Sequence, residues 1–569
     1  MGYDVCILGG GQSGLVTLKT FLETTKNILL LEQSDGHTGL FSTIKEQEAF
    51  TWSTSRYMSG FSDFPMPKTI PVWFTIKEYV AYLESYKSHF GLDSYIQYNS
   101  TVKTCYQDSN EEWVVQYNNH TQITCKKLII CTGLNQTPKY PEIINNFSGK
   151  IIHTHDVYTN MNKHDWARTF SGKRILLLGG AESAYDIGHV ITKYAETLYY
   201  SSKNYTEWFP KGAEWLEIQQ RVKDINNKCL NKIYKKDAIT TPTDTQLNYI
   251  EYSLPEPMSQ IWHEYGRVIF YKFLGWDCAN CSHQNSELCK INETPRNLFK
   301  KYVVKRTEFI LDIFENKAEV VYYPDKINGK TVYTKEKQLD NIDIIVCATG
   351  YKKYFPFLED NVWKGELIKK MVPVNYKNIA FIGYARPTMG SIASVAEMQG
   401  WWIQRYFYDS SFTYTIRKPV IRTLDPLNLS NEHINTIVIG CYYLKDLAKD
   451  LKIEPNMLYL LFTDIKLFYK IFTGSCHPMM YRIHGYKYHD GARNILMDTY
   501  VSDDKKIGGE YMYLGFFLVL HGIFIASLVL FAFVASYSLH FKQLNRYLKY
   551  KTHIFLGLAI TLVILSYML

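Results

Sequence analysis

Two glycine-rich turns carry residue types and spacings that indicate chemistry, and the first lies at the start of the chain. Gly9, Gly11 and Gly14 follow an apolar, strand-like run and precede a helix-like stretch, in the G-x-G-x-x-G spacing of a dinucleotide turn. Glycine at these places permits a tight turn, close approach of a pyrophosphate and close packing of the helix on the strand. A second apolar run, residues 27–31, ends at Glu32, whose carboxylate is spaced to bind ribose hydroxyls. The sequence therefore predicts a dinucleotide at the helix N-terminus, where free N–H groups favour an anion.

The second turn repeats this pattern with alanine in place of two glycines. Gly179 follows the strand-like run 173–178, and Ala181 and Ala184 stand where the second and third glycines would be. Alanine is the smallest replacement that carries a Cβ, so we expect the turn to survive with less clearance for a phosphate.

The strand-like run after this second turn ends in hydroxyls and a cation instead of an acid. Ser202 and Lys203 occupy the position at which Glu32 follows the first turn. A cation there suits the 2′-phosphate of NADPH and disfavours NADH. The alternative is that Lys203 is an ordinary surface lysine, and the sequence leaves both interpretations open.

Two dinucleotide turns in one chain indicate that a hydride passes between two bound cofactors. We predict FAD at the N-terminal turn and NADPH at the second, so that the flavin accepts the hydride. The residues predicted to contact FAD are Gly9, Gly10, Gly11, Gln12, Ser13, Gly14 and Glu32. Those predicted to contact NADPH are Gly179, Ser183, Ala184, Tyr185, Asp186, Ser202 and Lys203.

Apolar runs that end in glycine turns must position these sites. Such runs, interleaved with helix-like stretches, are typical of parallel sheets with sites at the carboxyl ends of their strands. Three further runs of this kind lie at residues 127–131, 343–347 and 378–382. The predicted fold class is α/β, with two Rossmann-like nucleotide-binding domains and C-terminal transmembrane helices.

Composition limits the partners. The net charge of +8 is small for 569 residues, and no basic helix with interleaved aromatic residues is present, so we expect no nucleic acid. The 11 cysteines are odd in number and scattered, which indicates a reducing compartment. Cys278, Cys281, His283 and Cys289 could bind zinc, but their spacing matches no known finger, and reduced loop cysteines are the favoured alternative. No metal site is predicted.

The C-terminal residues predict contact with membrane lipid. Residues 511–541 and 552–569 contain no Lys, Arg, Asp or Glu, and the first stretch is long enough to span a bilayer. We expect helices at about 511–538 and 552–569, with a hairpin or an interfacial helix as the alternative for the second. By the positive-inside rule, the basic residues between the two stretches favour a cytosolic loop and hence a lumenal catalytic domain. The NADPH supply and the free cysteines favour a cytosolic catalytic domain, which we predict, with a hairpin or a tail that lies partly in the interface.

An ordered series of motifs along the whole chain resembles the flavin-containing monooxygenases. The run 147–153 fits the identifying sequence F-x-G-x-x-x-H of that family, although the aromatic residue that follows is displaced by one position. Further matching groups are both glycine turns, Phe64-Pro65-x-Pro67, Ala348-Thr349-Gly350-Tyr351, Glu397-x-Gln399, residues 463–467, Gly474-x-Cys476-x-Pro478 and residues 491–494. With the apolar tail, the series is most similar to the microsomal, animal-type branch, which implies the endoplasmic reticulum membrane.

The resemblance implies that NADPH reduces the flavin, that O₂ adds at its C4a atom, and that a tertiary amine or thioether takes the distal oxygen. It also implies that Leu40, Phe41 and Trp52 contact FAD. Ser53 and Thr54 stand where the family carries an asparagine between the two cofactors, so we expect them to be the catalytic positions. A hydroxyl is a less fixed hydrogen-bond partner than an amide. His153 is expected to hold a linker between domains, and a homo-oligomer is left open.

The resemblance also suggests a domain organisation. Residues 1–150 and 331–440 would form a discontinuous FAD-binding domain, and 151–330 an NADPH-binding domain with an insertion that shapes the substrate pocket. Residues 441–508 would lie close to the membrane, and 509–569 would anchor the chain in it.

Two alternatives remain at the level of the sequence. A Baeyer–Villiger-type monooxygenase shares the architecture, but its identifying run usually ends in a Trp-Pro or Trp-Asp pair, which Val157-Tyr158 does not match. A membrane-anchored NADPH oxidase, in which reduction is uncoupled from oxygen transfer, is suggested by Ala181, Ala184 and Ser53.

Overall fold

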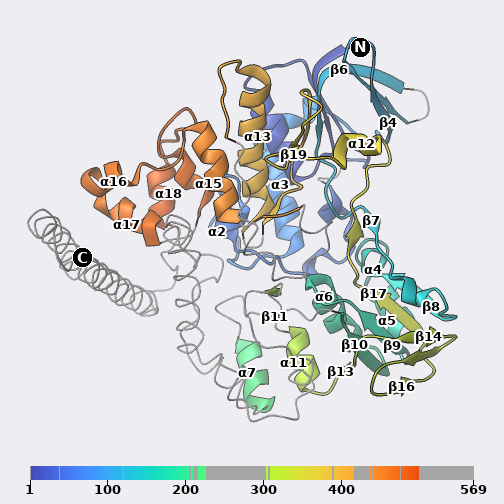
Figure 1. Cartoon of the computed structure of the whole chain (residues 1–569). Helices are drawn as coiled ribbons and strands as arrows, with labels where there is room; N and C mark the ends of the chain where they lie inside the picture. The colour runs from blue at the N-terminus through green and yellow to red at the C-terminus, as the bar shows by residue number, and fades with distance from the viewer. Residues whose placement is uncertain are drawn as a thin grey trace, which may run out of the picture.

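Two sheets and a C-terminal group of helices make up the computed structural model (Figure 1). It describes residues 2–36, 39–118, 121–203, 207–208, 216–225, 303–304, 308–387, 390–415, 436–438, 440–473 and 476–498. The sheets lie one above the other along the right of the view, and the C-terminal helices lie at the left. The chain crosses between the sheets twice, so the first sheet is built from two segments and the second from the segment between them.

The first sheet has a parallel core with an antiparallel extension. The central residues of its parallel strands are buried and apolar on both faces, which is the pattern of a sheet covered by helices on both sides. The parallel strands, in spatial order, are β3 (Ile96–Gln97), β2 (Ile28–Leu31), β1 (Gly2–Leu8), β6 (Thr121–Ile130) and β21 (Ile379–Phe381). The antiparallel strands β5 (Trp113–Tyr117) and β4 (Val102–Gln107) also extend from β6.

The second sheet is parallel throughout. Its strands, in spatial order, are β13 (Glu319–Val320), β10 (Thr197–Ser201), β9 (Arg174–Leu178), β17 (Ile344–Cys347) and β8 (Lys150–His153). The parallel sheets predicted from the glycine turns are therefore confirmed, and the fold is α/β with Rossmann-like sheets.

The position of one strand differs from that expected from the predicted domain boundaries. Strand β17 lies between β9 and β8, whereas the sequence assigned it to the FAD-binding segment 331–440. All four of its residues are buried, because this central position covers both of their faces. The second unit therefore extends at least to Cys347, and the remaining domain boundaries stay predictions.

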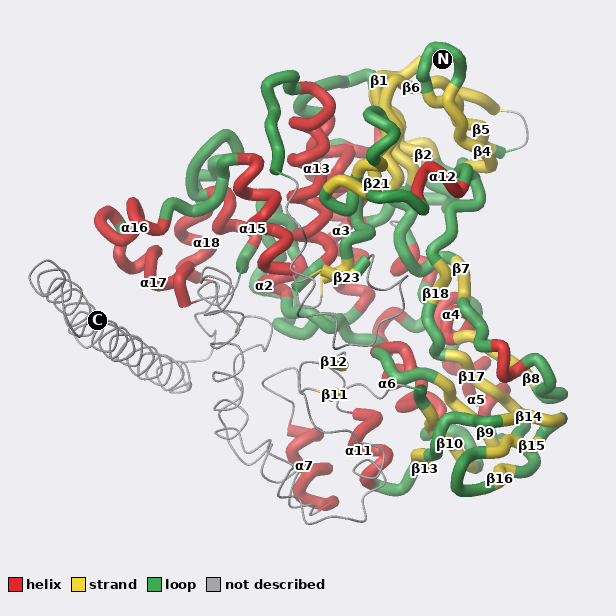
Figure 2. Tube along the Cα trace, viewed as in Figure 1, coloured by secondary structure: helices red, strands yellow, loops and turns green. Residues whose placement is uncertain are grey.

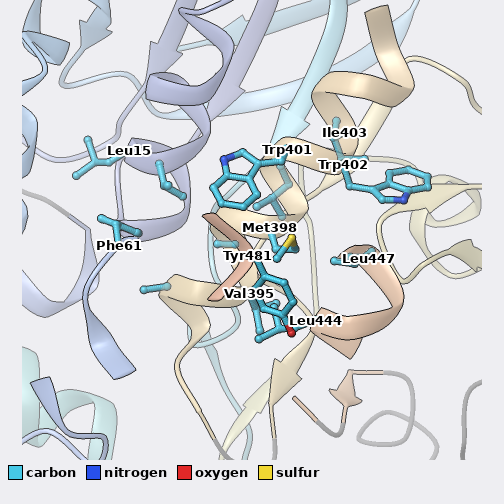
Figure 3. Packing of buried hydrophobic residues seen from close by; sticks show 14 of the residues in the cluster. Leu15, Phe61, Val395, Met398, Trp401, Trp402, Ile403, Leu444, Leu447 and Tyr481 are labelled. Atoms are coloured by element: carbon cyan, nitrogen blue, oxygen red, sulfur yellow. The ribbon is translucent and has the colours of Figure 1, made fainter. Parts of the chain in front are cut away.

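Helices α1 (Gln12–Phe21) and α13 (Ile392–Tyr408) pack against each other on the first sheet. Their contact is apolar, and Figure 3 shows Trp401, Met398 and Val395 of α13 among residues of several other elements. Tyr481 and Leu444 enter the same cluster from the C-terminal part of the chain, so that part belongs to the first core.

Helix α3 (Ile76–His89) also covers the first unit and has well-defined ends. Thr75 and Glu78 form a capping box at its start, and Gly91 follows its end in the left-handed conformation. In the second unit, α6 (Glu182–Ile191) packs on α11 (Glu308–Phe314), while α4 (Thr154–Thr159) and α5 (Lys163–Phe170) lie on the other side of α6.

The C-terminal helices form a separate group beside α13 (Figure 2). They are α15 (Gly440–Leu451), α16 (Met457–Thr463), α17 (Ile465–Thr473), the 3₁₀ helix η9 (Pro478–Arg482) and α18 (Ala492–Asp498). Within the described ranges, no helix is both long and apolar enough to cross a bilayer. The predicted membrane helices at 511–538 and 552–569 lie outside the described residues.

The two crossings between the sheets are tied together. Strands β7 (Thr137–Pro138) and β18 (Tyr351–Lys352) pair antiparallel at the junction. Beside them, His153 is fully buried and caps α4, because its Nδ1 accepts a hydrogen bond from the backbone N–H of His155, 3.1 Å away. Its Nε2 therefore carries the proton and donates to the carbonyl oxygen of Gly350, 3.0 Å away. The side chain holds the junction, as the sequence predicted for this histidine.

Two helix-interior glycines predict opposite effects of the same substitution. A Cβ at Gly400 in α13 would lie 3.6 Å from Thr20, an ordinary contact, whereas a Cβ at Gly188 in α6 would lie 2.6 Å from the ring of Phe309. We expect Gly400→Ala to stabilise the protein by about 0.5–1 kcal/mol through helix propensity. Gly188→Ala should destabilise it by roughly 1–3 kcal/mol through overpacking. Thermal unfolding of both variants measures this, and shifts of the same sign would contradict the packing described.

The buried His153 predicts a loss of stability in acid. Burial lowers the pKa of His153 to about 4, from an ordinary value near 6.5. The folded state therefore resists protonation, so its stability is present above pH 6.5 and falls as the pH decreases toward 4. We expect His153→Asn to cost about 1–3 kcal/mol at pH 7.5 by removing the donor to Gly350, and to lose less stability than the wild type between pH 7 and 5. His164→Asn, at an exposed position on α5, is the control and should follow the wild type at every pH.

Candidate functional site

The first glycine turn lies between the end of β1 and the start of α1. A Cβ at Gly14 would lie 1.9 Å from the carbonyl oxygen of Gly9, so this close contact of helix and strand requires glycine. Gly9 has a φ of 100°, a conformation that favours glycine. The predicted turn geometry is present at both residues.

The space above Gly11 fits a pyrophosphate. The nearest heavy atom to a Cβ at Gly11 would be the Cα of Gly39, 3.8 Å away. No side chain caps the N-terminus of α1, and its first turn contains no acid. The exposed N–H groups and the helix dipole therefore suit an anion, and the turn fits the diphosphate of FAD.

Glu32 lies directly beside this turn. The backbone N–H of Gly10 donates to Oε2 of Glu32 at 2.5 Å, and the N–H of Ser34 donates to Oε1 at 2.9 Å. The carboxylate is 5% exposed, so it is fixed at the carboxyl end of β2, close to the turn. This is the position that a ribose-binding acid needs.

An aromatic stack joins the turn to the predicted flavin-contacting residues. The hydroxyl of Tyr79 on α3 donates to Oε1 of Gln12 at 2.5 Å. The ring centroid of Tyr79 lies 4.1 Å from that of Trp52, and the ring centroid of Trp52 lies 4.6 Å from that of Phe41. Phe41 belongs to a short 3₁₀ helix, η1 (Leu40–Thr43). The structure thus brings Gln12, Phe41 and Trp52 into one cluster, with Leu40 beside them in the chain.

Ser53 and Thr54 follow Trp52 directly, at the junction of the two units. Thr54 is buried and Ser53 half-buried. The hydroxyl of Ser59 donates to the carbonyl oxygens of Ser55, at 2.9 Å, and Thr54, at 3.4 Å, and so fixes the short helix α2 (Arg56–Ser59) after them. The aromatic cluster that precedes the two hydroxyl residues and the hydrogen-bonded helix that follows them therefore fix their position in the chain.

At its first glycine the second turn is tighter than the first turn, where a Cβ at Gly9 would lie 2.8 Å from the carbonyl oxygen of Cys131. Gly179 has a φ of 140°, and a Cβ there would lie 2.2 Å from the carbonyl oxygen of Ala348. Ala181 begins α6 without a side-chain cap, and Glu182 adds a carboxylate to the first turn. An acid at this place opposes the attraction of the helix N-terminus for a phosphate, and this departure was not among those predicted from the sequence.

The predicted NADPH residues of α6 divide between the core and the unit junction. Ala184 is fully buried, and Tyr185 packs edge-to-face on Tyr200 and Phe309. The side chains of Ala184 and Tyr185 therefore serve the core of the second unit. Asp186 instead accepts a hydrogen bond from the hydroxyl of Tyr158 on α4, 3.1 Å away.

The end of β10 places the predicted 2′-phosphate residues. Ser202 is 6% exposed, whereas Lys203 is exposed, with its ammonium group 5.4 Å from the ring centroid of Tyr323. A lysine held on an aromatic face beside the carboxyl end of a strand suits a phosphate. The structure leaves the assignment of Lys203 as a prediction.

Residues 45–52 join the flavin side to the second unit. The backbone N–H of Lys45 donates to the carbonyl oxygen of Tyr158 at 2.9 Å, and the ring of Phe50 lies 4.7 Å from that of Tyr158. A cavity of about 300 Å³ lies where residues 49–51 meet α5 and α6, and Asp186 and His189 contribute to its wall. This segment fixes how the two predicted cofactor sites face each other.

Several residues that organise the site were not among the predicted ones. Tyr79 is a helix tyrosine that no sequence signal separates from other aromatic residues, whereas Tyr158 is the displaced aromatic residue that follows the run 147–153. Among the residues that the structure describes, no cluster of His, Cys, Asp or Glu could hold a metal ion. Cys278, Cys281, His283 and Cys289 lie outside the described residues.

Comparison with known proteins identifies the family. A family model described as flavin-binding monooxygenase-like matches residues 2–262 and 310–538. Flavin-containing monooxygenase 5 of Cavia porcellus is 25% identical over 580 residues, covering 94% of this chain and 99% of the relative. The 4-hydroxybenzoate brominase (decarboxylating) of Marinomonas mediterranea is 25% identical over 501 residues, covering 84% of this chain and 90% of the relative.

Solved structures share the fold. An open cyclohexanone monooxygenase aligns with a TM-score of 0.55 at 15% identity, covering 79% of this chain and 97% of that one. A complex of OTEMO with FAD and NADP aligns with a TM-score of 0.56 at 16% identity over the same shares of the two chains. The match of the family model across most of the chain, with glycine turns that fit two dinucleotides, shows that the protein belongs to the flavin-binding monooxygenase-like family of NADPH-dependent oxidoreductases.

Proposed function

We propose that the protein is an NADPH- and O₂-dependent monooxygenase that oxygenates soft nitrogen or sulfur atoms of small molecules. The observation that carries this proposal is the extent of the family match, which spans both glycine turns and the C-terminal helices. One relative, from Macaca mulatta, is named dimethylaniline monooxygenase (N-oxide-forming) and is 26% identical over 529 residues. That name describes the oxygenation of a tertiary amine.

The residues of this chain would bind and orient the cofactors. Bound flavin supplies the activation of O₂, which no side chain can provide. The uncapped N-terminus of α1 and the clearance above Gly11 would hold the diphosphate, while Glu32 would bind the ribose. The stack of Tyr79, Trp52 and Phe41 would exclude water from the reacting face.

Ser53 and Thr54 would be the polar groups nearest the reaction. Their hydroxyls can each donate one hydrogen bond and accept others, so they can stabilise an oxygen atom that carries partial negative charge. The hydrogen of a hydroxyl rotates about the C–O bond, whereas the N–H groups of an amide are fixed in the amide plane. We therefore expect weaker control of the reacting oxygen here than in relatives that carry an amide. The carboxylate of Glu182 would repel the phosphate, and the two alanines of the second turn would leave it less room. Both effects would lower the affinity for NADPH.

Two other reactions are supported by specific relatives. The fold likeness to cyclohexanone monooxygenase favours a ketone substrate, and the named brominase favours a halide in place of an amine. An NADPH oxidase that releases hydrogen peroxide is the outcome expected if Ser53 and Thr54 fail to control oxygen transfer.

A substrate panel tests the function. The flavin-loaded enzyme is given NADPH with a tertiary amine, a thioether, a cyclic ketone, or 4-hydroxybenzoate plus bromide. NADPH consumption, hydrogen peroxide and product mass are then measured. We expect faster NADPH consumption and a product heavier by one oxygen atom with the amine or thioether only. A Ser53→Asn variant should lower the fraction of NADPH that ends as hydrogen peroxide. Oxygenation of the ketone or bromination of 4-hydroxybenzoate would contradict the proposal. Formation of one hydrogen peroxide for each NADPH consumed, under every condition, would also contradict it.

We further propose that the protein resides on the endoplasmic reticulum membrane with its catalytic part in the cytosol. Support comes from the two charge-free stretches of the tail, 511–541 and 552–569, and from exposed apolar side chains on α16, where Leu458, Tyr459 and Phe462 are 69%, 63% and 80% exposed. An apolar helix face that no other described element covers suits a lipid surface. We expect the full chain to sediment with microsomes after a carbonate wash, with added protease cleaving the catalytic part. Release by carbonate, or glycosylation of the catalytic part, would contradict this.

A further inference from the structure

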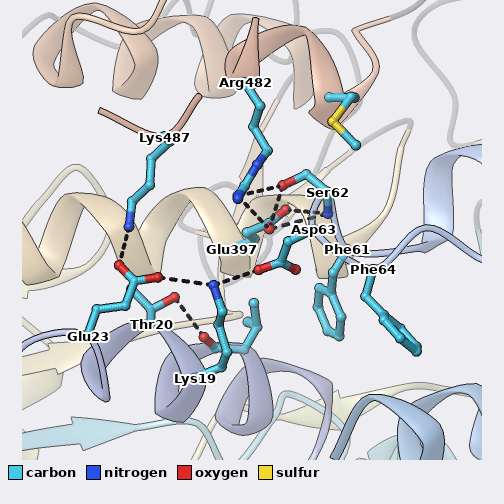
Figure 4. Close-up of polar contacts among 12 residues, drawn as sticks. Lys19, Thr20, Glu23, Phe61, Ser62, Asp63, Phe64, Glu397, Arg482 and Lys487 are labelled. Carbon is cyan, nitrogen blue, oxygen red and sulfur yellow. Dashed lines mark hydrogen bonds and ion pairs between the residues drawn. The ribbon is translucent and has the colours of Figure 1, made fainter. Parts of the chain in front are cut away.

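A buried cluster of charges connects four segments of the first unit that are distant in sequence (Figure 4). Its centre is the pair of neighbouring residues Ser62 and Asp63, in the loop after α2. Glu397 of α13 and Arg482 of η9 approach Ser62, while Lys19 of α1 approaches Asp63. Glu397 is 1% exposed, so its carboxyl group is entirely removed from water.

Glu397 holds Ser62 through both the backbone and the side chain. The hydroxyl of Ser62 donates to Oε1 of Glu397 at 2.6 Å, and the backbone N–H of Ser62 donates to Oε2 at 3.0 Å. Nη1 of Arg482 donates to the hydroxyl oxygen of Ser62 at 3.2 Å and lies 3.9 Å from Oε1 of Glu397. Three elements thus meet at one serine.

Asp63 connects the same loop to the dinucleotide helix. Its Oδ2 lies 2.6 Å from Nζ of Lys19, in the last turn of α1. Its other oxygen, Oδ1, is buried and accepts no hydrogen bond in the described part of the chain. Lys19 also lies 3.0 Å from Glu23, which in turn pairs with Lys487 at 2.6 Å.

Two further contacts fix the loop between Thr54 and Ser62. The hydroxyl of Ser394 on α13 donates to the carbonyl oxygen of Met58 at 3.2 Å, and the buried His477 hydrogen-bonds the backbone of Tyr57. Helix α13 and the C-terminal segment therefore hold the loop along its length, and Glu397 is its charged attachment.

We propose that Glu397 is a positioning residue for the flavin site, which as a carboxylate holds the loop that begins at Ser53 and Thr54 and loosens it when protonated. The proposal rests on these two residues lining the flavin site, as proposed above. Glu397 itself would touch neither cofactor nor substrate. Through Arg482, the state of the loop would also depend on the C-terminal helices.

The surroundings of Glu397 make its protonation accessible near neutral pH. Burial and the neighbouring Asp63 raise the pKa of Glu397 to about 7, while Arg482 and the hydrogen bonds from Ser62 oppose this shift. The titratable and charged groups that face it are Lys19 and Glu23 of α1, Asp63 of the loop, Tyr82 and Tyr86 of α3, and Arg482 and Lys487 of the C-terminal segment. Burial raises the pKa of both tyrosines, so neither titrates in this range.

The direction of the effect follows from the charge. Above pH 7 the carboxylate accepts the hydrogen bonds of Ser62 and attracts Arg482, so the loop is held. As the pH falls below 7, the attraction for Arg482 is lost and a proton is added where Ser62 donates. Glu397→Gln keeps the size and an acceptor oxygen but carries no charge, so it resembles the protonated state at every pH.

The test follows the bound flavin as a function of pH, without NADPH or substrate. Visible circular dichroism of the flavin-loaded full chain is recorded from pH 5.5 to 8.5, together with hydrogen exchange of peptides within residues 53–63, corrected for the intrinsic rate. In the wild type we expect both signals to titrate with a midpoint near 7. In Glu397→Gln we expect the titration to be lost, with the low-pH signal and the faster exchange at every pH.

Glu23→Gln is the matched control. It makes the same chemical change in the same charge cluster but does not contact Ser62, so its titration should match that of the wild type. A wild-type signal that does not titrate, or a Glu397→Gln titration equal to that of the wild type, would overturn the proposal. An effect of equal size in Glu23→Gln would also overturn it, because the cluster as a whole would then be responsible.

A second variant keeps the test decisive if Glu397→Gln does not load flavin. Ser62→Ala removes the 2.6 Å hydrogen bond but leaves the backbone N–H in place. We expect its midpoint to move above that of the wild type, because the carboxylate loses a donor. An unchanged midpoint would overturn the proposal. None of these measurements involves oxygenation, so a wrong substrate class would leave them unaffected. If the chain binds no flavin, both this proposal and the proposed function fail.

Discussion

The packing of one segment against two separate apolar cores is the constraint on which the arrangement of this protein depends. Phe41 and Trp52 pack against the core of the first unit and also against that of the second. Hydride transfer needs two cofactors to meet within contact distance, and the junction between their sheets sets that distance. Aromatic side chains suit that task because each buries a large area in few rotamers. The junction is therefore apolar at its centre, and Ser53 and Thr54 lie where the aromatic cluster ends.

Charged residues fix the rest of the first unit. Inside a protein a charge is stable only when it is paired and hydrogen-bonded, and the buried charges here are paired across elements. Lys369 lies 3.0 Å from Asp450 of α15, and Lys487 lies 2.6 Å from Glu23 of α1. These pairs attach the C-terminal helices to the dinucleotide-binding core. The part of the chain that leads to the apolar tail is thus mechanically connected to the flavin side.

The sequence predicted local features well and long-range pairings less well. The turns at Gly9 and Gly179 could be predicted because strand, glycine and helix are adjacent in the chain, and the backbone conformation required at each position excludes a larger residue. The place of β17 could not, because an apolar strand pairs equally well with either sheet, and its neighbours β8 and β9 lie more than a hundred residues away. Tyr185 shows the same limit, since a residue that follows a phosphate turn can point to the cofactor or to the core.

The sequence by itself determined the family, the α/β class and the two dinucleotide turns, because these depend on residues that are close together in the chain. Tertiary structure alone decided which side chains surround the predicted site. Tyr79 bonds Gln12 across 67 positions, and Glu397 bonds Ser62 across 335. Such contacts arise from the packing of whole helices, and no local pattern encodes them. The residue types of the predicted site are thus specified by short motifs, while their positions are set by a core that distant parts of the chain assemble.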